Sequence, residues 1–153
     1  MQDSLHLVLD HLAADADGAM ARWFEWLRIP SVSAQPAHAG DCRRAAEWLR
    51  GQLAGMGFET EICETPGHPI VLAHHPGPAK GASGSAPHLL YYGHYDVQPA
   101  EPLDLWTSPP FEPRLVDHPL GPRVVARGAV DDKGQVMLWM EALRAWIAAH
   151  GAP

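Results

Sequence analysis

The sequence of 153 residues has only two cysteines, Cys42 and Cys63, and they are not in a CxxC spacing. This excludes both a disulfide framework and a cysteine-based zinc knuckle, and we expect two incidental thiols. No apolar run approaches the roughly 20 residues that a membrane-spanning helix needs. The first residues also lack the basic and apolar segments of a signal peptide. We therefore expect a cytoplasmic protein without a membrane partner.

Positive charge is also scarce. The chain has 11 Lys and Arg residues against 18 Asp and Glu residues, which gives a formal net charge of −7. The basic side chains are dispersed along the chain and form no stripe that could bind a phosphate backbone, so nucleic acid is not an expected partner. The 46% of hydrophobic residues is sufficient for the core of one globular domain.

The spacing of apolar residues predicts four helices. Two consecutive helices are expected within residues 5–27, with a break near residues 15–18 and an end before Pro30. A third is expected to begin with Asp41 as its N-cap and to end near Gly55. A last helix follows residue 134, and its predicted apolar face is made of Val136, Met137, Met140, Leu143 and Ile147.

The predicted strands fall between these helices. Residues 58–63 alternate apolar and polar, and with the apolar residues 70–73 they predict a hairpin. A second pair of short strands is expected on either side of a turn at residues 117–122. Residues 76–87 are rich in Gly, Pro and Ser and predict a surface loop.

Residues 88–92 form an apolar run bounded by Gly93, which is typical of a buried strand in a largely parallel sheet. Helices followed by strands, and a strand leading into a final helix, predict an α/β fold with helices covering a sheet. In such sheets the chemistry gathers at the carboxyl ends of the strands.

His94 and Asp96 directly follow this predicted strand. An extended backbone would direct both side chains to the same side, because they are two residues apart. A metal-ligating histidine commonly gives its second N–H to a carboxylate, and Asp96 is placed to accept it. Taken alone, however, the triplet is better explained as a solvated surface pair, since the chain has ten histidines.

Asp131 and Asp132 lie between a glycine-bounded turn and the last helix. The simpler interpretation is a helix N-cap with a second acid favoured by the helix dipole. In the functional interpretation, a carboxylate at this corner bridges two divalent ions about 3.5–4 Å apart. Gly128 and Gly134 would then allow the backbone to approach closely.

Together these segments resemble the ordered signature of the M20 metallopeptidases. The resemblance is carried by residues 92–99 (YGHYDVQP), 105–113 (LWTSPPFEP) and 126–135 (ARGAVDDKGQ), with residues 27–33 similar to the family's opening helix-to-loop junction. It implies that His94 binds one metal, that Asp96 supports it in catalysis, and that Asp131 bridges both metals. The Asp-Asp-Lys-Gly form resembles the dipeptidase, carnosinase-like branch, whereas relatives acting on N-acyl amino acids more often have Asp-Met-Lys-Gly.

The resemblance implies a three-layer α/β/α zinc-peptidase-like catalytic domain with a mixed, largely parallel sheet. Residues 1–153 would be its N-terminal portion, incomplete at the C-terminus and without the lid or dimerisation domain, the catalytic glutamate and the remaining ligands. The implied cofactors are two divalent metal ions, zinc before manganese or cobalt. The implied substrate is a small peptide, hydrolysed by a two-metal-activated water, and by the same resemblance the whole form would be a homodimer.

Two alternatives stay open. The first is a deacylase of the same family that acts on N-acyl amino acids. The second is a truncated, non-catalytic binding or interaction module, because a chain that supplies only part of the ligand set is expected to be inactive alone. Trp106, Pro109, Pro110 and Phe111 could shape a substrate cleft, but a packed loop explains them better, and they receive no role.

Overall fold

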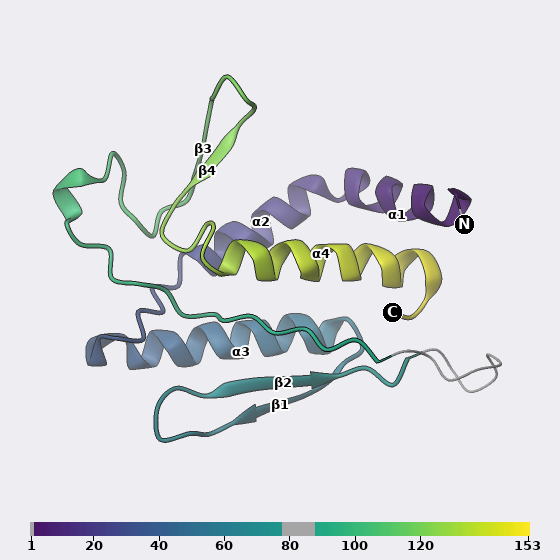
Figure 1. The fold of residues 1–153 in the computed structure, drawn as a ribbon, viewed down its shortest axis with the longest axis horizontal. Coiled ribbons are helices and arrows are strands. Elements are labelled where there is room, and N and C mark those ends of the chain that lie inside the picture. The colour runs from purple at the N-terminus through teal and green to yellow at the C-terminus, as the bar shows by residue number, and fades with distance from the viewer. Residues whose placement is uncertain (1, 78–87) are drawn as a thin grey trace.

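The structure is a computed structural model that describes residues 2–77 and 88–153, and it shows a mixed α/β arrangement (Figure 1). In chain order the elements are α1 (Gln2–Ala14), α2 (Ala16–Leu27), the 3-10 turn η1 (Pro36–His38), α3 (Ala39–Gly55), β1 (Glu59–Cys63), β2 (Ile70–His74), η2 (Leu103–Leu105), β3 (Arg114–Val116), β4 (Arg123–Val125) and α4 (Lys133–His150). The four predicted helices are confirmed, as are both predicted hairpins.

α4 lies along α1 and α2 (Figure 1). Between them, the Arg22 guanidinium donates to both carboxylate oxygens of Glu141, at 2.8 and 2.6 Å, and to Asp15 at 2.6 Å. A bidentate contact of this kind is directional and stronger than a neutral hydrogen bond. The break between α1 and α2 at Asp15 is thus tied to the middle of α4.

The core lies where α2, α3 and α4 meet. Trp26 is fully buried, stacks on Trp48 with ring centroids 5.2 Å apart, and donates its indole N–H to the Ala45 carbonyl. The buried residues of this cluster are Trp26, Leu53, Met56, Val136, Met137 and Met140. The apolar face predicted for the last helix is therefore the face that packs into the core.

Both sheets are two-stranded and antiparallel. β1 pairs with β2 from Glu59 opposite His74 to Cys63 opposite Ile70, and this hairpin packs on α3 (Figure 1). β3 pairs with β4 over three residue pairs and projects from the rest of the molecule (Figure 1).

The prediction of a buried strand at residues 88–92 is wrong. In the part of the chain that the structure describes, this segment pairs with no strand, and Leu89, Leu90 and Tyr92 are 85%, 93% and 85% exposed. Tyr91 alone packs inward and stacks on Trp139 of α4 at 4.2 Å. An apolar run favours burial. A strand, however, also needs a neighbouring strand whose backbone groups can hydrogen-bond with its own N–H and C=O groups. Within the described residues, the expected parallel sheet is reduced to one bridge between Val32 and Val97.

Two further expectations concern helix ends and loops. The N-cap of α3 is His38, three residues earlier than predicted, and Asp41 lies in the first turn. There the Asp41 carboxylate bonds His38 Nδ1 at 2.6 Å instead of capping the helix.

Most of the loop predicted for residues 76–87 lies outside the described residues. No helix in the described part of the chain is both long and apolar enough to cross a membrane.

Candidate metal centre

The structure brings the three predicted site residues together. His94 Nδ1 lies 3.0 Å from Asp96 Oδ1, and on the other edge of the ring His94 Nε2 lies 3.2 Å from Asp131 Oδ1. Asp131 comes from the segment immediately before α4, whereas His94 and Asp96 come from the extended segment that runs between α4 and α3 (Figure 1). One imidazole is therefore placed between two carboxylates.

The His94–Asp131 pair fits a divalent metal ion by its donor chemistry and its spacing. When Nδ1 gives its hydrogen to Asp96, a neutral ring presents a lone pair at Nε2 toward the Asp131 oxygen. Two electron-rich atoms facing each other need a proton or a cation to stabilise them. Two ligands of a tetrahedral zinc ion lie about 3.3 Å apart, close to the observed 3.2 Å.

The site is open on the Asp131 side. The side chains of His94 and Asp131 are 41% and 73% exposed. Across the described residues, no group of three or more His, Cys, Asp or Glu side chains is arranged to hold a metal. His94 and Asp131 would therefore form part of a ligand set, and further ligands would approach from the exposed side.

The surrounding carboxylates also change the acidity of the imidazole. Burial by itself lowers the pKa of His94, but the charge of Asp96, its hydrogen bond and the charge of Asp132 together outweigh burial. The net result is a pKa above the usual histidine value. In the absence of a metal, the same field that would attract a cation attracts a proton.

The loop of residues 28–35, which we call the Ser31 loop, follows α2 and aligns the segment that carries His94 and Asp96. The Val97 N–H donates to the Ser31 carbonyl at 2.9 Å, and the Ser31 hydroxyl donates to the Tyr95 carbonyl at 2.7 Å. Ser33 follows and donates its hydroxyl to Asp96 Oδ2. Sequence reasoning assigned no role to Ser31 or Ser33. The resemblance of residues 27–33 to a family junction was the one signal that could have found them.

Asp132 makes a contact that the sequence did not indicate. It occupies the N-cap position of α4 but makes no side-chain capping hydrogen bond. Its Oδ2 instead accepts the backbone N–H of His94 at 3.0 Å. The simple N-cap interpretation therefore does not describe this carboxylate, which fixes the backbone of the predicted metal ligand.

The glycines near the site are required by close approach, as predicted. Gly128 has a φ of +82°, and a Cβ there would lie 2.8 Å from Val97 Cγ1. A Cβ on Gly134 would lie 2.0 Å from the Ala129 carbonyl oxygen. Backbone atoms, which cannot rotate away, thus face Gly134 where the Asp131 turn enters α4.

Lys133 joins the start of α4 to the end of α2. Its side chain is fully buried, and Nζ donates to the carbonyls of Trp26 at 2.9 Å and Ile29 at 2.7 Å. Burial lowers the pKa of Lys133 from 10.5 to about 7. The Lys133 amine therefore ties the start of α4, next to Asp131, to the end of α2, from which the Ser31 loop begins.

We expect this buried amine to make stability depend on pH. Between about pH 7 and 10.5 the folded state binds fewer protons at Lys133 than the unfolded state, so the free energy of unfolding should rise with pH. Below about pH 7 both states are protonated at this amine, and its effect on the slope disappears. The maximum slope is about 1.4 kcal/mol per pH unit. Urea unfolding of the wild-type protein and Lys133→Met at pH 7 to 8.5 would measure it, and equal pH slopes for the two proteins would contradict it.

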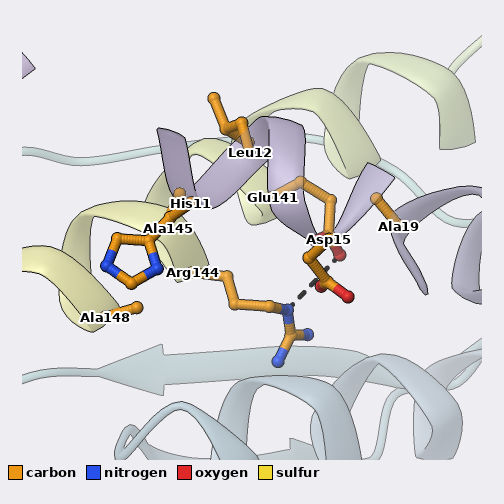
Figure 2. A pocket seen from close by; sticks show the side chains of 8 residues that line it. All are labelled: His11, Leu12, Asp15, Ala19, Glu141, Arg144, Ala145 and Ala148. Carbon is orange, nitrogen blue, oxygen red and sulfur yellow. Dashed lines mark hydrogen bonds and ion pairs between the residues drawn. The ribbon is translucent and has the colours of Figure 1, made fainter. Parts of the chain in front are cut away.

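A hollow of about 240 Å³ lies elsewhere, between the α1–α2 junction and α4 (Figure 2). Figure 2 shows Arg144 extending across it toward Glu141, whose carboxylate it contacts at 3.4 Å. Glu141 is already bonded twice by Arg22. The polar groups at this hollow thus serve the packing of the helices, and the predicted chemistry lies outside it.

The chain is similar to known hydrolases. Residues 90–153 match the model of peptidase family M20/M25/M40. A succinyl-diaminopimelate desuccinylase of Aromatoleum aromaticum is 33% identical over 78% of this chain and 28% of its own length. A cysteinylglycine-S-conjugate dipeptidase of Corynebacterium striatum is 37% identical over 74% of this chain and 23% of its own length.

Two solved structures have the same fold over nearly the whole chain. The di-peptidase Dug1p of Saccharomyces cerevisiae has a TM-score of 0.79 and 27% identity, covering 100% of this chain and 33% of its own. Human carnosine dipeptidase 1 has a TM-score of 0.79 and 25% identity, covering 97% of this chain and 32% of its own. This chain therefore spans a third or less of the length of these proteins. The matched segment shows similarity to peptidase family M20/M25/M40, and the relatives and the shared fold extend this similarity over nearly the whole chain.

Proposed function

We propose that the protein to which these residues belong hydrolyses dipeptides or short peptides, with divalent metal ions held in part by His94 and Asp131. The observation that carries the proposal is the His94 imidazole between Asp96 and Asp131, with contacts of 3.0 and 3.2 Å. The structural likeness of this chain to two dipeptidases, over 97–100% of its length, supports the choice of substrate. Zinc is the proposed metal, because imidazole and carboxylate ligands suit it.

Each of the three residues has a distinct task in this proposal. Asp96 holds the hydrogen of His94 on Nδ1, which leaves Nε2 free to bind a cation. Asp131, the most exposed of the three, can offer its two oxygens to different ions. When bound, the two ions would polarise the scissile carbonyl and make a water molecule nucleophilic at neutral pH.

We also propose that the described residues do not catalyse by themselves. They supply one imidazole and one shared carboxylate, and no group of three metal-binding side chains is found among them. A two-metal hydrolase needs several protein ligands and a general base that takes a proton from water. In this proposal those groups come from other parts of the whole protein.

A deacylase is the second candidate, and the desuccinylase relatives favour it. The succinyl-diaminopimelate desuccinylases of Aromatoleum aromaticum and Paraburkholderia xenovorans are 33% and 35% identical to this chain. Removal of a succinyl group breaks an amide bond, as dipeptide hydrolysis does. The same three residues could therefore serve either reaction.

A substrate panel on the whole protein would separate the two candidates. We expect zinc-loaded protein to hydrolyse unblocked dipeptides, including carnosine and cysteinylglycine, at least tenfold faster in kcat/KM than N-acetyl or N-succinyl amino acids. Liberated amino acid would be measured by mass spectrometry, and a chelator-treated sample provides the control. A preference for the N-acyl substrates would replace the dipeptidase proposal with the deacylase. No turnover of either class would contradict both.

A further inference from the structure

The Ser31 loop runs beside the segment that carries the metal-site residues. The bridge between Val32 and Val97, with the Val97 N–H on the Ser31 carbonyl at 2.9 Å, fixes their parallel alignment. The loop is also contacted by His68, whose Nε2 lies 2.9 Å from the Ser33 carbonyl oxygen. Ser33 is therefore held at a defined position beside Asp96.

The two oxygens of the Asp96 carboxylate have different partners. Oδ1 lies 3.0 Å from His94 Nδ1, and Oδ2 accepts the hydroxyl of Ser33. A carboxylate is planar, so contacts at both oxygens fix its rotation about the bond to Cβ. The Asp96 side chain is 37% exposed, and without Ser33 water could bond Oδ2 in other orientations.

The orientation of Asp96 decides which nitrogen of His94 carries hydrogen. A neutral imidazole has one N–H. Which of the two ring nitrogens carries the hydrogen is set by their hydrogen-bond partners. Asp96 accepts at Nδ1, and Nε2 is then the nitrogen that faces Asp131 at 3.2 Å. The carboxylate is the closer and charged acceptor at Nδ1, at 3.0 Å against 3.2 Å for the Asp96 backbone carbonyl. If the carboxylate turned away, the tautomer with hydrogen on Nε2 would become more populated, and that nitrogen could not bind a cation.

We propose that Ser33 is a positioning residue that orients Asp96 and thereby fixes the tautomer of His94 that binds a divalent cation. The inference rests on the proposed function, because it takes His94 as a metal ligand. It adds a residue from the α2–α3 connection, 63 positions from its carboxylate partner. The loss of a group that orients a metal-ligating residue typically lowers metal affinity about 10–100-fold.

Ser33→Ala and its matched control Ser4→Ala would test the proposal in the whole protein. Both remove one serine hydroxyl, but the Ser4 hydroxyl lies 3.0 Å from His150 Nε2 at the end of α4 and does not contact the segment that carries His94 and Asp96. In metal-free protein labelled with ¹⁵N-histidine, NMR shifts of the ring nitrogens report the tautomer of the neutral imidazole. Calorimetric titration with zinc reports affinity.

We expect His94 in the wild-type protein and in Ser4→Ala to carry its hydrogen on Nδ1. Ser33→Ala should show mixed ring-nitrogen shifts and about tenfold or greater loss of zinc affinity, and Ser33→Thr should restore both. Wild-type shifts in Ser33→Ala, or equal losses in the two alanine variants, would overturn the proposal. Absence of zinc binding by the wild-type protein would instead contradict the proposed function, while the nitrogen shifts would still decide the role of Ser33.

Discussion

His94→Ala in the whole protein is expected to lower kcat/KM for a dipeptide about 1000-fold. A metal ion that polarises the carbonyl contributes several kcal/mol of transition-state stabilisation, and each 1.36 kcal/mol corresponds to about tenfold in rate. The substitution removes the imidazole nitrogen that faces Asp131. Steady-state hydrolysis and metal content by atomic emission spectroscopy would measure the two consequences together.

His6→Ala is the matched control for this experiment. His6 lies on the exposed side of α1, so the same truncation there should leave both activity and metal content unchanged. Retention of more than a tenth of wild-type kcat/KM by His94→Ala, at wild-type metal content, would show that this imidazole is not a ligand. Unchanged circular dichroism of both variants would separate loss of the metal from loss of the fold.

Gly134→Ala is expected to have the largest effect on stability. Its Cβ would lie 2.0 Å from the Ala129 carbonyl oxygen and 2.9 Å from the carbonyl carbon, so the backbone of one segment must move. Overpacking of this kind typically costs 1–3 kcal/mol, and because the obstacle is backbone we expect about 3 kcal/mol. The displaced turn carries Asp131, so metal affinity should fall as well.

Gly51→Ala makes the same chemical change but is expected to stabilise the protein. Gly51 is an exposed residue inside α3, and a Cβ added there would have no neighbouring atom within 4 Å. Alanine at this position should raise the free energy of unfolding by about 0.5–1 kcal/mol, because it reduces the entropy of the unfolded chain. Urea unfolding of both variants would compare them, and a Gly134→Ala loss below about 1 kcal/mol would contradict the clash.

The sequence predicted the local elements well, because their signals are local. Helix periodicity and the alternation of residues 58–63 depend on neighbouring positions, and the structure has these elements within a few residues of the predicted ends. The segment at residues 88–92 was different. Its apolar character predicted a strand, but whether a strand forms depends on partners elsewhere in the chain, which local pattern does not report.

The residues of the candidate site were likewise only partly predictable from local sequence pattern. The motif resemblance located His94, Asp96 and Asp131, and the structure places the imidazole within hydrogen-bond distance of both carboxylates, while their roles stay predictions. Ser33 and Asp132 could not be assigned from local pattern. Their contacts cross 63 and 38 positions of sequence, and a serine or a helix-start aspartate has a common explanation without them.

The alignment of the Ser31 loop with Tyr95 and Val97 also has a consequence for folding kinetics. The Ser31–Tyr95 hydrogen bond closes a separation of 64 residues, and the His94–Asp131 contact closes a further 37. Contacts of such length are entropically costly until the intervening segments are ordered. The His94–Asp131 pair should therefore form late in folding. Zinc bound to this pair should slow unfolding while leaving the early refolding phases unchanged.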